Sequence, residues 1–92
     1  MIYQIEYDLT AEVDISELKK TNAIAYKKLI KLIKELHHHP RYGTGKPEML
    51  KYGNYKGLWS RRITRKHRLI YSINDNQISV LIVSVQGHYD DK

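Results

Sequence analysis

The fold is decided by residues 58–85, LWSRRITRKHRLIYSINDNQISVLIVSV, because this stretch contains a succession of strand patterns. The expected strands cover residues 58–63, 67–73 and 77–85. They are rich in β-branched and aromatic side chains, and turn residues at 64–66 and 74–76 separate them. Short turns of this kind join antiparallel neighbours, so the stretch predicts three antiparallel strands.

The N-terminal part of the chain predicts one more strand and a pair of helices. Residues 2–9 alternate in the period of two that is typical of a strand. Thr10 or Asp14 is expected to cap a first helix, and Asn22 a second. The second helix carries an apolar stripe at helical spacing, made of Ala25, Leu29, Leu32, Ile33 and Leu36. Glycine and proline in residues 40–48 predict the end of this helix and a loop.

The resulting order, β-α-α-β-β-β, predicts an α+β fold. We expect a helical hairpin packed on one face of a small antiparallel β-sheet, with the other face available for function. A chain of 92 residues is sufficient for one domain, which we expect to span residues 1–92.

Composition excludes several classes of protein. The chain has no cysteine, which excludes disulfides and thiolate metal sites. It has no apolar run near the ~20 residues that span a bilayer, and its N-terminus does not resemble a signal peptide. We therefore expect a cytoplasmic protein with no membrane partner.

The positive charge of the chain is concentrated in residues 46–68. This segment holds eight Lys and Arg side chains and a single carboxylate, that of Glu48, so its net charge is +7 against +6 for the whole chain. A field that concentrated predicts a phosphate-rich partner. Arg62 and Arg68 flank the first hairpin turn, and we expect them to lie side by side. Like charges placed opposite each other are destabilising unless an anion joins them, which indicates a phosphate site.

Four ordered motifs connect this segment with the end of the chain. They are GKPE at 45–48 followed by LK at 50–51, WSRRI at 59–63, HRLIY at 67–71, and HY at 88–89. On these motifs the chain resembles the YoeB/Txe family of the RelE/ParE toxin superfamily, over about residues 22–89. The resemblance implies a RelE-like fold and a toxin of a type II toxin–antitoxin module.

The resemblance also implies an activity and a set of residues. Toxins of this family are ribosome-dependent mRNA endoribonucleases that cut in the decoding site without metal or cofactor. By motif, the general base falls on Glu48, the transition-state cation on Arg68, and the general acid on His88 with Tyr89 beside it. We assign RNA or phosphate binding to the basic residues of the segment, namely Lys46, Lys51, Arg61, Arg62 and Arg65. The expected partners are a cognate antitoxin, the ribosome and mRNA, and a homodimer is left open.

The residue types suit this chemistry. Attack by a 2′-hydroxyl on the neighbouring phosphate needs a base for that proton, an acid for the leaving 5′ oxygen and cations for the charged intermediate. Glu, His and Arg supply these functions.

Other interpretations of the same residues are kept open. Glu48 could form a salt bridge with a neighbouring lysine or arginine instead of acting as a base. The whole protein could be a ParE-like inhibitor of DNA gyrase, or an RNA-binding module without activity. His37, His38 and His39 are adjacent on a helix and point about 100° apart, so we do not expect them to converge on a metal.

Overall fold

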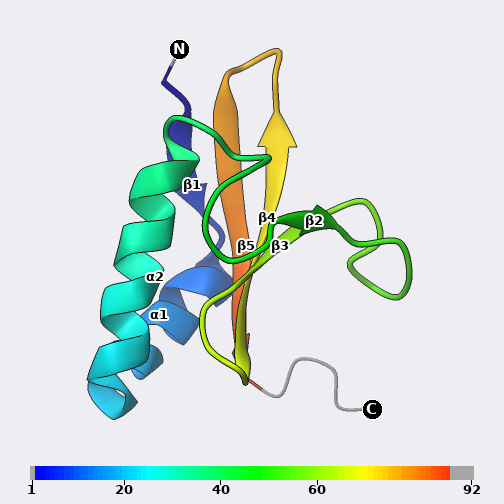
Figure 1. Cartoon of the computed structure of the whole chain (residues 1–92). Helices are drawn as coiled ribbons and strands as arrows, with labels where there is room; N and C mark the ends of the chain where they lie inside the picture. The colour runs from blue at the N-terminus through cyan, green and yellow to red at the C-terminus, as the bar shows by residue number, and fades with distance from the viewer. Residues whose placement is uncertain (1, 88–92) are drawn as a thin grey trace.

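The computed structural model describes residues 2–87, which form two helices and one five-stranded sheet (Figure 1). The elements are β1 (Gln4–Tyr7), α1 (Leu9–Thr21), α2 (Ala23–Leu36), β2 (Glu48–Met49), β3 (Trp59–Arg62), β4 (His67–Asn74) and β5 (Ser79–Gly87). Both helices lie on one side of the sheet, and β2 with the loop after it extends on the other (Figure 1). The predicted α+β architecture is confirmed.

The sheet is mostly antiparallel, in the order β1-β5-β4-β3-β2. The three strands predicted from residues 58–85 pair as antiparallel neighbours. Two details differ from the expectation. β1 runs parallel to β5, because two helices rather than a tight turn separate it from the other strands and no turn sets its direction. The expected loop at 41–48 ends in the short strand β2, which pairs with β3.

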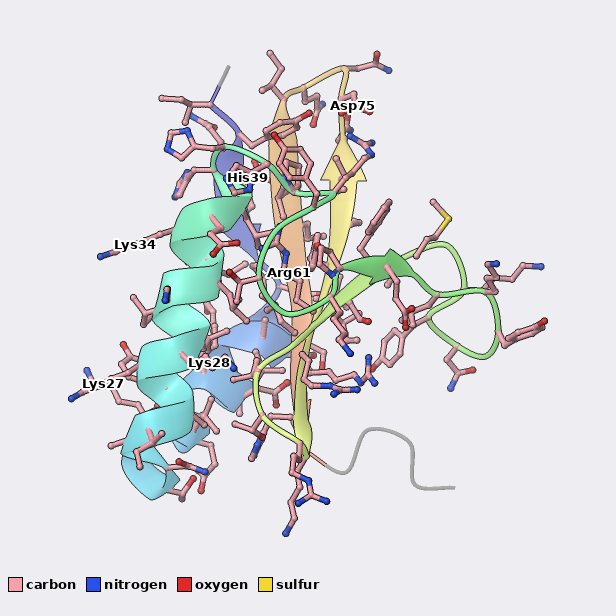
Figure 2. All side chains as sticks on the ribbon, viewed as in Figure 1. Lys27, Lys28, Lys34, His39, Arg61 and Asp75 are labelled. Atoms are coloured by element: carbon pink, nitrogen blue, oxygen red, sulfur yellow. The ribbon has the colours of Figure 1, made fainter. Side chains whose placement is uncertain are left out.

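Helix α2 supplies one side of the core, as its apolar stripe predicted. The side chain of Asn22 accepts a hydrogen bond from the backbone N–H of Ala25 at 3.0 Å, which confirms the predicted N-cap. All five stripe residues are buried, and they form one cluster with Leu69, Tyr71 and Ile82 of the sheet. The lysines of α2 lie off the stripe and are exposed, with Lys27 and Lys34 pointing away from the sheet (Figure 2).

Helix α1 begins earlier than predicted. It starts at Leu9 after Asp8, so neither Thr10 nor Asp14 is its cap. The carboxylate of Asp14 instead accepts hydrogen bonds from the Ser84 hydroxyl at 3.1 Å and the Val85 backbone N–H at 3.0 Å. Asp14 therefore ties the helix to β5. Neither helix in the described part of the chain is long and apolar enough to cross a bilayer.

Candidate functional site

The face of the sheet opposite the helices carries the two arginines that the sequence placed side by side. Arg62 of β3 and Arg68 of β4 are directly paired across the hairpin. Leu69 and Tyr71 of β4 belong to the core under the helices, so alternation along the strand turns Arg68 to the opposite face. Arg62 is exposed and the Arg68 side chain is 22% exposed. The two arginines, paired across the strands, thus form a cationic site that an anion can reach.

Glu48 joins this site from β2. Its strand partner is Ser60 of β3, and its Oε2 atom lies 3.9 Å from Nη1 of Arg68 across that strand. The same Arg68 nitrogen is 3.4 Å from the Ser60 hydroxyl. Glu48 therefore forms a salt bridge with an arginine, the alternative to a catalytic role that the sequence left open. The pair is long, and the Glu48 side chain is 63% exposed, so it contributes roughly 0–1 kcal/mol. A phosphate could displace it at little cost.

Arg61 is not in this site, and its assignment to phosphate binding is wrong. The side chain is 0% exposed and points to the core face of the sheet, between α2 and the loop that follows it (Figure 2). The guanidinium donates hydrogen bonds to Glu35 Oε1 (2.7 Å), the Tyr71 hydroxyl (3.2 Å), and the carbonyl oxygens of His39 (2.6 Å), Tyr42 (2.8 Å) and Thr44 (3.3 Å). No donor is left to bind RNA.

The Arg61 contacts fix the loop that leads to Glu48. Thr44 donates to the Glu35 carboxylate through its hydroxyl (2.6 Å) and its backbone N–H (2.9 Å). The next residue, Gly45, accepts a 2.7 Å hydrogen bond from the backbone N–H of Arg62. Gly45 has a φ of +88°, and a Cβ there would lie 2.8 Å from the Arg62 carbonyl oxygen, so only glycine permits this close approach. The loop is thereby fastened to β3 just before β2.

Two pKa values in this network are shifted, that of Glu35 by hydrogen bonding and that of Tyr71 by burial. Burial alone would raise the pKa of the Glu35 carboxyl, but the hydrogen bonds from Thr44 and Arg61 outweigh it and hold that pKa below its usual value. The Tyr71 hydroxyl donates to the Pro40 carbonyl at 2.7 Å, and burial raises its pKa above the usual value. At neutral pH the network therefore contains a carboxylate, a guanidinium and a neutral phenol.

The other predicted site residues are dispersed around the cationic site. Lys46, Lys51 and Arg65 are exposed, Lys46 next to the Gly45–Arg62 contact and Arg65 in the hairpin turn. His88 and Tyr89 lie outside the described residues. The last residue of β5, Gly87, pairs with His67, which precedes Arg68 on β4.

A hollow of about 330 Å³ adjoins the site on the β2 side. It is lined by Glu48, Met49, Leu50, Lys51 and Tyr52. The sequence did not predict this hollow, because it depends on how the loop after β2 folds. The sequence also did not identify Glu35 as the partner of Arg61. Strand alternation was the available signal, since it puts Arg61 on the same face as the apolar Trp59 and Ile63.

The histidines at the end of α2 have separate partners. His37 Nδ1 lies 2.8 Å from the Tyr3 carbonyl oxygen, whereas the His39 ring stacks on Tyr42 with ring centroids 4.8 Å apart. Within residues 2–87, no three His, Asp or Glu side chains are grouped in a way that could hold a metal ion.

Comparisons with known proteins place this architecture among bacterial toxins. The family described as "YoeB-like toxin of bacterial type II toxin-antitoxin system" matches residues 7–89. Toxin YoeB of Escherichia coli K12 is 45% identical over 71 residues, which cover 77% of this chain and 81% of that protein. Toxin YoeB of Synechocystis is 49% identical over 67 residues, which cover 68% of this chain and 74% of that protein.

Solved structures agree with the sequence comparisons. A YoeB/ParE toxin from Agrobacterium tumefaciens superposes with a TM-score of 0.83 at 31% identity, covering 94% of this chain and 99% of that one. The toxin in a YoeB–YefM complex from Staphylococcus aureus gives 0.77 at 33% identity, covering 97% and 100%. The archaeal RelE of a RelE–RelB complex from Pyrococcus horikoshii gives 0.72 at 19% identity, covering 95% and 96%, and shows the shared fold.

The buried position of Arg61 predicts a large loss of stability when it is replaced. Arg61→Met leaves the Glu35 carboxylate without its cation and the loop carbonyls without their donor, so we expect a loss of about 3–5 kcal/mol in the free energy of unfolding. Arg62→Met, the exposed neighbour, serves as control and should change it by about 0.5 kcal/mol or less. Urea unfolding measures both. Equal values for the two variants would contradict the structure.

The lowered pKa of Glu35 predicts a pH-dependent contribution to stability. The folded-state pKa lies below the ordinary value of 4.5, so the ionised carboxylate stabilises the protein fully above that pH. The contribution is lost as the pH falls through the lowered value. Glu35→Gln cannot ionise, so its stability deficit relative to wild type should be largest near neutral pH and shrink in acid. Urea unfolding across this range tests the prediction, and a constant deficit would contradict it.

Proposed function

The chain belongs to the YoeB-like toxins of bacterial type II toxin–antitoxin systems, and we propose from this that it is an endoribonuclease that cuts mRNA in the decoding site of the ribosome. The observation that carries the proposal is the position of Glu48, which meets Arg68 across β3 with Arg62 paired beside it. An acceptor for a proton and two cations for a phosphate thus share one exposed face. This combination suits phosphodiester cleavage.

The proposed reaction uses the hydroxyl next to the scissile phosphate. The Glu48 carboxylate takes the proton of the 2′-hydroxyl, and the 2′ oxygen forms a bond to phosphorus while the bond from phosphorus to the 5′ oxygen breaks. The leaving 5′ oxygen receives a proton from His88. The products are a 2′,3′-cyclic phosphate and a 5′-hydroxyl, and no metal or cofactor takes part. Arg62 and Arg68 stabilise the charge that develops on the phosphate oxygens.

Displacement of the ion pair links binding to catalysis. When a phosphate binds Arg68, it competes with the 3.9 Å contact to Glu48 and relieves the repulsion between Arg68 and Arg62. The Glu48 carboxylate is then released toward the substrate hydroxyl. The ion pair and the catalytic base are therefore two states of one residue, before and after RNA binds.

The roles of His88 and Tyr89 rest on their motif. Support comes from the end of β5, because Gly87 pairs with His67, the neighbour of Arg68 on β4. The described part of β5 thus ends beside the start of β4. Lys46, Lys51 and Arg65 would hold the RNA backbone around it.

We also propose a cognate antitoxin as partner. Solved complexes of relatives, such as YoeB–YefM from Staphylococcus aureus, support this partner, and a structure described as a YoeB dimer from the same organism supports a homodimer. An acidic or amphipathic segment of the antitoxin would cover the +7 segment. Action on ribosomes implies a cytoplasmic location.

Substitution of the proposed base tests the activity. Glu48→Gln keeps the size of the side chain and removes its charge, so we expect message cleavage to fall about 10²–10⁴-fold. Arg68→Lys and His88→Gln should give losses of similar size. Glu6→Gln is the matched control, since Glu6 is an exposed carboxylate on β1, at the opposite edge of the sheet. Primer extension on a translated message measures the cuts, and end analysis detects the cyclic phosphate.

Three results would contradict the proposal. Cleavage by Glu48→Gln at the wild-type rate would remove Glu48 from the chemistry. Growth arrest with DNA damage and intact messages would instead favour a gyrase inhibitor of ParE type. Salt-dependent RNA binding without cut products would favour a plain RNA-binding module.

A further inference from the structure

The hollow beside Glu48 has a lining that suits a nucleobase. We propose that it is a base-binding subsite, in which the ring of Tyr52 stacks on an RNA base near the scissile phosphate while Lys51 contacts the backbone. The inference rests on the proposed function, because Glu48 forms one wall of the hollow. It adds a recognition element to a site that otherwise contacts only phosphate and ribose.

Tyr52 is exposed in a way that suits stacking. Its side chain is 86% exposed, and Met49 beside it in the hollow is 50% exposed. No described residue stacks on the Tyr52 ring. Tyr42 provides a contrast, because it is 67% exposed but its ring already stacks on His39. Tyr52 is therefore a large aromatic surface left uncovered next to the site.

The loop that carries Tyr52 is held by its own backbone. The N–H of Leu50 donates to the Leu58 carbonyl at 2.7 Å, and the N–H of Gly57 donates to the Leu50 carbonyl at 2.8 Å. These bonds close the base of the loop, and a turn inside it is closed by a bond from Lys56 N–H to the Gly53 carbonyl at 3.2 Å. Gly53, directly after Tyr52, has a φ of +81°, a backbone conformation that residues with a side chain rarely adopt. Little entropy is lost when a base binds such a preorganised loop.

The distance along the chain suits a neighbouring nucleotide. Tyr52 follows Glu48 by four residues, a separation of at most about 14 Å even for extended backbone. Both residues line the same hollow, so an RNA strand whose 2′-hydroxyl reaches Glu48 can place an adjacent base over Tyr52. Aromatic stacking tolerates any base, because every base has a π-face.

The surrounding charge favours RNA over a protein segment as occupant. Lys51 lines the hollow, exposed Lys56 lies in the same loop, and Arg68 is in contact with Glu48. RNA, a polyanion with flat bases, can bind both to the positive charge and to the aromatic surface. An antitoxin segment could meet the charge, but an acidic peptide has no need of an exposed stacking ring.

The experiment compares Tyr52→Ala, Tyr52→Phe and the control Tyr42→Ala. Loss of one base–aromatic stack should lower single-turnover cleavage on programmed ribosomes by about tenfold or more in Tyr52→Ala. Tyr52→Phe keeps the ring and should cut at nearly the wild-type rate, as should Tyr42→Ala. Circular dichroism confirms that each variant is folded, which the exposure of Tyr52 leads us to expect.

Two further arms identify the source of the base. If the base belongs to the message, an abasic nucleotide beside the cleavage site should lower the cleavage rate of the wild-type protein about as much as the Tyr52→Ala substitution does. The abasic message should not lower the rate of Tyr52→Ala any further. If it belongs to ribosomal RNA, Tyr52→Ala should bind more weakly to ribosomes that carry no message, and the abasic message should make no difference. Either pattern supports a base at Tyr52.

The outcomes separate this inference from the proposed function. Binding is measured in the Glu48→Gln background, so it does not depend on cleavage. Suppose that the wild-type protein cleaves, and that Tyr52→Ala equals Tyr42→Ala both in cleavage and in binding. That result would overturn the subsite and leave the endoribonuclease intact. No cleavage by wild type, with RNA or ribosome binding still dependent on Tyr52, would overturn the endoribonuclease alone. A defect of Tyr52→Ala confined to antitoxin binding would assign the hollow to a protein partner and overturn the subsite.

Discussion

The guanidinium of Arg61 joins α2, the loop after α2, β3 and β4 at one buried point. Removing an arginine from water is costly, and the structure offsets that cost with the Glu35 carboxylate, the Tyr71 hydroxyl and backbone carbonyls of the loop. Carbonyls that satisfy a buried cation cannot move away without leaving it unpaired. The loop therefore has a fixed course across the edge of the core. Its path determines where β2 begins, and with it the position of Glu48.

The sheet then divides the roles between its two faces. On the helix side, Arg61 and the apolar stripe of α2 hold the layers together. On the other side, the neighbouring Arg62 pairs with Arg68, and Glu48 meets Arg68 across β3. Two adjacent arginines thus serve opposite purposes because successive residues of a strand point to opposite faces. The fold holds Arg61 in its interior and leaves Arg62 exposed on the face where we propose that phosphate binds.

Much of this organisation could be predicted from the sequence, and the errors have physical causes. The apolar spacing in α2, its Asn22 cap and the three C-terminal strands followed from local periodicity, as did the pairing of Arg62 with Arg68. Counting charge without applying strand alternation put Arg61 in the predicted phosphate site. The direction of β1 and the short strand β2 depend on long-range contacts that no local pattern encodes. The hollow at Tyr52 depends on loop hydrogen bonds for the same reason.

Hydrogen exchange of individual amides tests most directly whether the Arg61 network makes the loop part of the core. The informative amides are those of Thr44, bonded to Glu35, and Arg62, bonded to Gly45. If the network fixes the loop, both should exchange only through global unfolding, as slowly as amides in the middle of β4. Exchange by local opening, as fast as at the exposed residues 51–54, would contradict the claim that buried Arg61 positions Glu48.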